Sequence, residues 1–104
     1  LINSSTLARM KESAVLINTT RGGVVDQQAL WEALSSRTIA AAGLDVTTPE
    51  PLPTDHPLLA LHNCVILPHL GSASIATRTR MALMAADNLI AGVKGMPLPN
   101  AVTI

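Results

Sequence analysis

The sequence has almost no aromatic residues, because Trp31 stands alone and neither phenylalanine nor tyrosine occurs. It therefore lacks the rows of aromatic side chains on which nucleic-acid bases stack. It also lacks an excess of positive charge, since 7 Lys and Arg residues are balanced by 7 Asp and Glu residues. A protein that neutralises phosphates needs such an excess. We therefore expect no nucleic-acid partner.

Cysteine and long apolar runs are scarce as well. Cys64 is the only cysteine, so an intramolecular disulfide is excluded and a reducing compartment is favoured. No apolar run approaches the roughly 18 residues that suggest a membrane span. The first residues, Leu1 to Ser5, do not have the pattern of a signal peptide. These absences predict a cytoplasmic location and no membrane partner.

The residues that are present favour one small globular domain with an ordinary apolar content of 48%. Three short apolar runs, at 14–18, 39–44 and 64–67, alternate with helical patterns. Unbroken apolar runs are typical of strands that are buried on both faces of a parallel sheet. The alternation predicts an α/β fold with right-handed crossovers. Because three strands make a narrow sheet, we expect one half of a doubly wound sheet.

Three helices are expected, over residues 4–12, about 27–35 and 74–94. Ser4 or Ser5 is the expected N-cap of the first helix, and Asp26 that of the second. Ser72 and Ser74 are candidates for the cap of the third, which ends at a glycine and a proline. Four prolines between residues 47 and 57 exclude regular structure there.

Polar side chains follow each predicted strand, at the end where open parallel sheets bind ligands. Arg21 follows the first strand, Asp45 and Glu50 the second, and His69 the third. We therefore expect these four side chains to converge on one edge of the sheet.

Each of these side chains has a functional and a structural interpretation. Arg21 could pair with a substrate carboxylate or lie solvated on the surface. His69 could act as a general acid or be a structural histidine. Glu50 could pair with His69 or remain a loop carboxylate. Asp45 could accept a hydrogen bond from a cofactor amide or cap a turn.

Other titratable residues give no sign of a site. His56 and His62 are expected on the surface, and Asp55-His56-Pro57 has no metal-ligand spacing. We expect no metal. Met81 and Met84 on the third helix are expected in a core or an interface. No G-x-G-x-x-G occurs in the sequence, so the chain carries no dinucleotide fingerprint.

Together, four blocks resemble the D-isomer-specific 2-hydroxyacid dehydrogenase family. The blocks are Ile17–Gly22, Ala42–Val46, Glu50-Pro51 and Pro68–Gly71, in the order and spacing of that family. The resemblance covers essentially the whole chain. Residues 52–59 and 63–69 are most similar to the branch that reduces glyoxylate and hydroxypyruvate.

The resemblance implies a role for each site residue. Arg21 would bind the carboxylate of a 2-oxo acid and polarise its carbonyl group. His69 would protonate the carbonyl oxygen while hydride arrives from the cofactor, and Glu50 would pair with His69. The positions implied at the nicotinamide end of the cofactor are Thr19, Asp45, Gly71 and Ser72.

The resemblance also implies a domain organisation. Residues 1–73 would form the C-terminal half of a Rossmann-type NAD(P)-binding domain. Residues 74–104 would form a long helix and a tail that returns to a substrate domain absent from this sequence. The implied cofactor is NADP, with NAD as the alternative, and the intact protein would be a homodimer. We expect that the fragment alone does not reduce glyoxylate.

Other functions remain open from the sequence. Transcriptional corepressors of the C-terminal-binding-protein type, which respond to NAD(H), share the fold and the Arg, Glu and His residues. After Pro-His, however, they have a sequence like Ala-Ala-Trp, where this chain has Leu70-Gly71-Ser72. An inactive truncated product is a further alternative. Phosphoglycerate, formate and D-lactate dehydrogenases share the same blocks.

Overall fold

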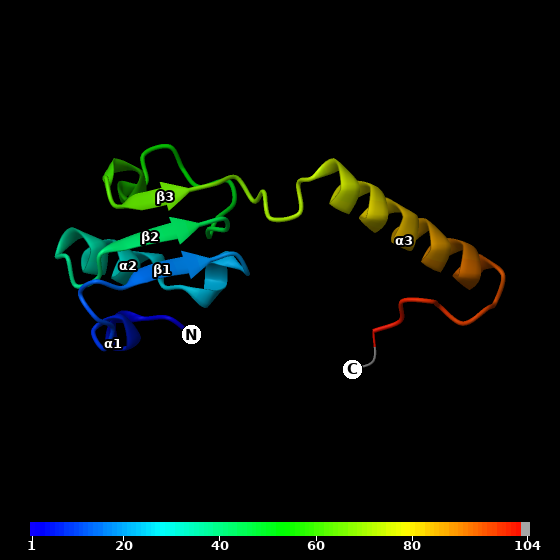
Figure 1. Ribbon diagram of the computed structural model, residues 1–104, viewed down its shortest axis with the longest axis horizontal. Helices are drawn as coiled ribbons and strands as arrows, with labels where there is room; N and C mark the ends of the chain where they lie inside the picture. Colours follow the sequence, from blue (N-terminus) through cyan, green and yellow to red (C-terminus); the bar gives the residue numbers. More distant parts are fainter. Residues whose placement is uncertain (103–104) are drawn as a thin grey trace. The chain divides into compact units, whose positions relative to one another are not determined.

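The computed structural model describes residues 1–102 of the chain (Figure 1). It contains two compact units, of which the first is Leu1–Gly71 and the second begins at Ser72. The two units are considered separately below. The last two residues of the predicted tail, 103 and 104, lie outside the described residues. Within the part that is described, no helix is both long and apolar enough to cross a membrane.

The first unit is built on a parallel sheet of three strands in the order β1-β2-β3. The strands are β1 (Val15–Asn18), β2 (Ala41–Leu44) and β3 (Cys64–Ile66). In the register, Val15 pairs with Ala41 and Ala42 pairs with Cys64. The α/β class and the parallel sheet are therefore confirmed. All three strands end on the same edge, toward which the arrows of Figure 1 point.

Helix α2 (Gln27–Ser35) forms the first crossover of this sheet. Its N-cap is Asp26, as predicted, and the Asp26 carboxylate accepts a hydrogen bond from the Ala29 amide at 3.0 Å. The loops after β1 and β2 also contain two short 3-10 helices, which were not predicted from the sequence. They are η1 (Gly22–Val24) and η2 (Pro57–Ala60).

Helix α1 (Ser4–Leu7) is a single turn, so the predicted helix over 4–12 is wrong. The N-cap is Asn3 and not Ser4 or Ser5, because Asn3 and Thr6 form a reciprocal capping box. The helix ends at Ala8, where the following amides bond to carbonyls only three residues back. These 3-10 type turns are tighter than the turn of an α-helix, and the chain then continues to β1.

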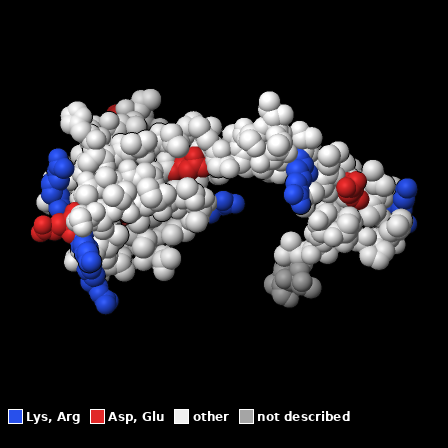
Figure 2. Space-filling view, viewed as in Figure 1, with Lys and Arg blue, Asp and Glu red and all other residues white. Residues whose placement is uncertain are grey.

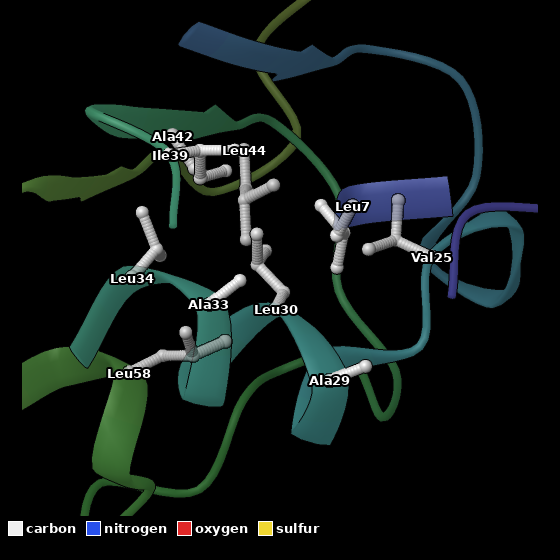
Figure 3. Close-up of a cluster of buried hydrophobic side chains, with 10 residues drawn as sticks. All are labelled: Leu7, Val25, Ala29, Leu30, Ala33, Leu34, Ile39, Ala42, Leu44 and Leu58. Carbon is white, nitrogen blue, oxygen red and sulfur yellow. The ribbon is translucent and has the colours of Figure 1, made fainter. Parts of the chain in front are cut away.

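The core lies between α2 and one face of the sheet (Figure 3). It consists of aliphatic side chains alone, and Trp31 only packs against its border. The buried cluster contains Leu7, Val25, Ala29, Leu30, Ala33, Leu34, Ile39, Ala42, Leu44 and Leu58. Burial of this face explains why α2 carries alanine and leucine on its inner side.

Within the first unit the opposite face of the sheet is uncovered, so these residues alone do not bury the strands on both faces as expected. Side chains alternate between the two faces of a strand. Val15 is 55% exposed, Ile17 63% and Val65 61%, whereas Ala42 and Leu44 are buried. The first unit places α2 and η2 against one face only, which leaves the other apolar residues in solvent.

The second unit consists of α3 (Ile75–Val93) and the segment after it. Ser74 is the N-cap and accepts a hydrogen bond from the Thr77 amide at 3.2 Å, whereas Ser72 lies two residues before it. The helix ends as predicted at Gly95, whose φ is +65°. The Met96 amide bonds to the Ala91 carbonyl at 2.9 Å, which closes a Schellman-type cap.

Candidate active site

The candidate site lies where the three strands end. Each of the loops that follow β1, β2 and β3 carries one of the predicted catalytic residues, Arg21, Glu50 and His69. At this end of the first unit, Figure 2 shows acidic and basic groups on a surface that is otherwise mostly uncharged. The three loops are neighbours although they are far apart in the sequence, because Glu50 bonds to His69 and Gly22 lies against the Thr47 carbonyl.

Glu50 and His69 form a hydrogen-bonded pair, with 3.0 Å between Glu50 Oε2 and His69 Nδ1. The second oxygen, Glu50 Oε1, accepts a hydrogen bond from the Thr47 amide at 2.9 Å. The hydrogen bond with His69, followed by that with Thr47, holds the pKa of Glu50 below its ordinary value of 4.5. The charges of His69 and Arg21 act in the same direction, and burial opposes them. Glu50 is therefore a carboxylate at neutral pH.

His69 has a backbone conformation that residues other than glycine rarely adopt, with φ of 57°. This left-handed conformation costs about 1–2 kcal/mol for an L residue. The buried Asp45 carboxylate stabilises the turn that follows, because it accepts hydrogen bonds from the Leu70 amide at 2.6 Å and the Gly71 amide at 2.8 Å. Asp45 thus fixes the backbone beside the histidine.

Gly71 lies close against Asp45 in the same turn. A Cβ atom at this position would lie 3.0 Å from Asp45 Oδ2, which is tighter than most Cβ contacts, so the carboxylate would have to move slightly. Asp45 therefore has the turn-capping role that the sequence left open. A carboxylate offers about four acceptor sites, so two more donors can still bind to Asp45.

Arg21 lies in a loop that is held by the buried side chain of Asn18. The Asn18 amide nitrogen donates to the Arg21 carbonyl at 3.0 Å, and its oxygen accepts from the Thr20 amide at 3.1 Å. The exposed Arg21 guanidinium makes one hydrogen bond to the neighbouring Thr20 carbonyl, at 2.7 Å. A guanidinium has five N–H groups, so it retains donors for an anion.

Gly22 brings the arginine loop into contact with the loop that carries Glu50. A Cβ atom at Gly22 would overlap with the carbonyl carbon and oxygen of Thr47. Only glycine permits this approach of the two backbones. The positive charge of Arg21 consequently lies close enough to contribute to the lowered pKa of Glu50.

A cavity of about 470 Å³ adjoins the Glu50–His69 pair. Glu50, His69 and Thr47 are its polar members. The rest of the lining is apolar and consists of Pro51, Leu52, Leu59, Ile66, Leu67 and Pro68. The pair itself lies at the mouth of this cavity in contact with solvent, since the His69 side chain is 48% exposed and that of Glu50 39%.

Two residues that organise the site were not singled out from the sequence. Asn18 holds the arginine loop, and its only signal was a polar residue at the end of an apolar run. Thr47 holds Glu50 through its backbone amide, and its hydroxyl donates to the Pro49 carbonyl at 2.9 Å. A backbone contact of this kind leaves no signature in the sequence.

The residues of the first unit fit the nicotinamide end of a dinucleotide by the chemistry of their donors and acceptors. Asp45 retains acceptor capacity for the amide N–H groups of a carboxamide, and Thr19 presents an exposed hydroxyl in the adjacent loop. Ser72 is the first residue of the second unit, and its role stays a prediction. Within residues 1–102, no three His, Cys, Asp or Glu side chains are grouped as metal ligands.

Comparison with known proteins gives consistent matches. The family model of the D-isomer specific 2-hydroxyacid dehydrogenase, NAD binding domain, matches residues 1–71. Glyoxylate reductase/hydroxypyruvate reductase of Homo sapiens is 59% identical over 104 residues, which are 100% of this chain and 32% of the relative. Glyoxylate reductase of Korarchaeum cryptofilum is 55% identical over 102 residues, 98% of this chain and 31% of the relative.

A solved structure is similar to this chain over nearly its whole length. The NADPH-dependent glyoxylate/hydroxypyruvate reductase of Sinorhizobium meliloti, in complex with NADP and malonate, superimposes with a TM-score of 0.92 at 40% identity. The match covers 98% of this chain and 32% of that protein. The chain therefore spans about a third of the length of the relatives it matches.

Proposed function

Because this chain belongs to the D-isomer specific 2-hydroxyacid dehydrogenase family, we propose that it forms the catalytic part of a 2-oxo acid reductase. The enzyme would reduce glyoxylate to glycolate, or hydroxypyruvate to D-glycerate. The observation that carries the proposal is the Glu50–His69 pair, with 3.0 Å between its atoms, at the end of the sheet where Arg21 lies. The names of the Homo sapiens and Sinorhizobium meliloti relatives support the two substrates.

Arg21 binds the substrate in this proposal. Its free guanidinium donors would pair with the carboxylate of the 2-oxo acid, and a charge-assisted bidentate pair fixes both position and orientation. Such an interaction also places the neighbouring carbonyl group, because the two groups of a 2-oxo acid are joined by one bond. The Asn18 side chain holds the backbone from which Arg21 projects.

His69 donates the proton in this proposal. Its Nδ1–H is held by Glu50, so Nε2 would donate to the carbonyl oxygen of the substrate. The hydrogen bond to Glu50 fixes the orientation of the imidazole ring and the tautomer of its neutral form. A bound nicotinamide cofactor supplies the hydride that reduces the carbonyl carbon.

The proposed cofactor is NADP, with NAD as the alternative. Thr19, Asp45, Gly71 and Ser72 are the residues proposed at its nicotinamide end. The NADP bound to the Sinorhizobium meliloti relative supports the first cofactor, and the matching NAD binding domain model fits either one. The cytoplasmic location and the homodimer implied by the resemblance stay predictions.

A chimeric enzyme tests this function. The 104 residues would replace the matching segment of the Homo sapiens relative, which is 59% identical over that length. We expect the purified chimera to oxidise NADPH when glyoxylate or hydroxypyruvate is added. A folded chimera that binds NADPH but reduces neither acid would contradict the proposal, and is what the corepressor alternative predicts.

A further inference from the structure

The side chain of Gln27 makes two hydrogen bonds to the backbone of Thr48. Its amide nitrogen donates to the Thr48 carbonyl at 2.8 Å, and its amide oxygen accepts from the Thr48 amide at 2.7 Å. Gln27 is the first residue of α2, and the two residues are 21 positions apart in the sequence. The first turn of α2, whose inner face packs in the core, is thus tied to the loop that follows β2.

Thr48 is next in the sequence to Thr47, whose backbone holds Glu50. Thr47 donates its backbone N–H to Glu50 Oε1 at 2.9 Å. The Thr47 carbonyl is pressed against Gly22 of the arginine loop. Fixing Thr48 therefore fixes the Thr47 backbone, which in turn sets where the Glu50 carboxylate meets His69.

Glutamine is suited to this task because its amide supplies one donor and one acceptor side by side. The donor and acceptor of a single backbone residue are thereby satisfied together. The loop after β2 has few backbone N–H groups for internal hydrogen bonds, because Pro49 and Pro51 have no N–H to donate. Gln27 is partly buried, but both hydrogen bonds lie at the exposed surface, so it is the pairing of the two bonds on one backbone residue that holds the loop.

We propose that Gln27 is a positioning residue for the Glu50–His69 pair. It would act through the Thr48 and Thr47 backbone and touch neither substrate nor cofactor. Its effect on turnover rests on the proposed function, whereas its effect on the Glu50 carboxylate does not.

Gln27→Ala in the chimera described above removes both hydrogen bonds. We expect kcat to fall about 10-fold with the KM for the 2-oxo acid unchanged, because small displacements of a catalytic group slow the chemical step. The matched control is Gln28→Ala, since Gln28 bonds only to Glu32 on the exposed side of α2, at 2.9 Å. Gln27→Glu keeps the acceptor but sets a carboxylate oxygen against the Thr48 carbonyl, so its kcat should fall at least as far as that of Gln27→Ala.

A second measurement does not depend on turnover. The side-chain carboxyl carbon of Glu50, assigned with Glu50→Gln, is titrated by NMR in the same chimeras. A displaced Glu50 loses part of its hydrogen bonding to Thr47 and His69, so its pKa should rise toward 4.5 in Gln27→Ala. The titratable and charged groups that act on Glu50 are His69 and Arg21, and neither is altered.

The proposal is overturned if Gln27→Ala matches Gln28→Ala in kcat and in the Glu50 titration. It is also overturned if Gln27→Ala lowers only the unfolding temperature, since that result shows a purely structural role. If the unmodified chimera reduces no 2-oxo acid, the proposed function fails, and the Glu50 titration still decides the role of Gln27.

Discussion

At the scale of single residues, the site depends on one carboxylate that stays charged. Two hydrogen bonds and two positive neighbours lower the pKa of Glu50, so its negative charge is present at every pH above 4.5. The pair with His69 therefore adds to stability above pH 4.5 and loses that contribution as the pH falls through the lowered pKa. At neutral pH the carboxylate is available to accept the hydrogen bond from His69 Nδ1.

Glu50→Gln in the chimera preserves the shape of this side chain and removes its charge. We expect kcat for the 2-oxo acid to fall about 10-fold, because the charge-assisted hydrogen bond that orients the His69 ring is replaced by a weaker neutral one. Steady-state rates measure the effect, and an unchanged kcat would show that Glu50 does not assist His69.

Gly22 is the residue on which the contact between the loop of Arg21 and the loop of Glu50 depends. Gly22→Ala places a Cβ atom on the Thr47 carbonyl, so we expect the free energy of unfolding to fall by about 1–3 kcal/mol, as in other overpacked sites. Gly23→Ala is the control, because nothing lies within 4 Å of its added carbon. Urea unfolding of the chain, followed by the fluorescence of Trp31, measures both, and equal values would contradict the close approach.

The sequence predicted the chemical groups of the site better than the contacts that hold them. Arg21, Glu50 and His69 could be picked out because polar residues that follow apolar strands share one edge of a parallel sheet. The hydrogen bonds from Gln27 to Thr48 could not be predicted, because they join a side chain to a backbone 21 positions away. Backbone donors and acceptors are the same for nearly every residue, so such bonds leave no pattern in the sequence.

At the scale of secondary-structure elements, local signals succeeded where they were strong. Asp26 before α2, and Ser74 and Gly95 at the ends of α3, are capping residues that the sequence marks clearly. The prediction of a first helix over residues 4–12 was wrong because it relied on the helical spacing of Leu7 and Met10, whereas the helix ends after one turn and the chain continues to β1. The tertiary fold here overrides the local helix propensity.

Two glycines of α3 should respond in opposite directions to the same substitution. Gly95→Ala forces an alanine to φ of +65° and should destabilise the end of the helix by about 1–2 kcal/mol. Gly92→Ala lies inside the helix, where alanine is favoured by about 1 kcal/mol. Its added carbon would make an ordinary contact with Leu98 at 3.6 Å.

Amide hydrogen exchange in the last turn of α3 measures both glycine variants. Faster exchange in Gly95→Ala and slower exchange in Gly92→Ala is the expected result. Equal exchange rates in the two variants would show that the Schellman-type cap does not end this helix.

At the scale of the whole molecule, the first unit is a sheet with one covered and one open face. The prediction of doubly buried strands assumed a second layer, and the first unit supplies only one. The chain spans 32% of the Homo sapiens relative, and no G-x-G-x-x-G for a cofactor phosphate occurs in it. The groups proposed for proton transfer and carboxylate binding are thus present without a phosphate-binding turn.

We therefore predict that the 104-residue chain alone oxidises no NADPH with glyoxylate, whereas the chimera does. The physical reason is that the phosphates of the dinucleotide contribute much of its binding and have no glycine-rich turn here. The two proteins would be compared at equal concentration by the absorbance of NADPH. Turnover by the isolated chain would contradict this prediction.

The central claim is that His69, held by Glu50, gives a proton to the substrate. Its most direct test is His69→Gln in the chimera, with NADPH binding followed by fluorescence and turnover by absorbance. We predict that NADPH binding is retained and that kcat falls by at least about 100-fold, the usual contribution of a general acid. Turnover close to that of the unmodified chimera would contradict the claim.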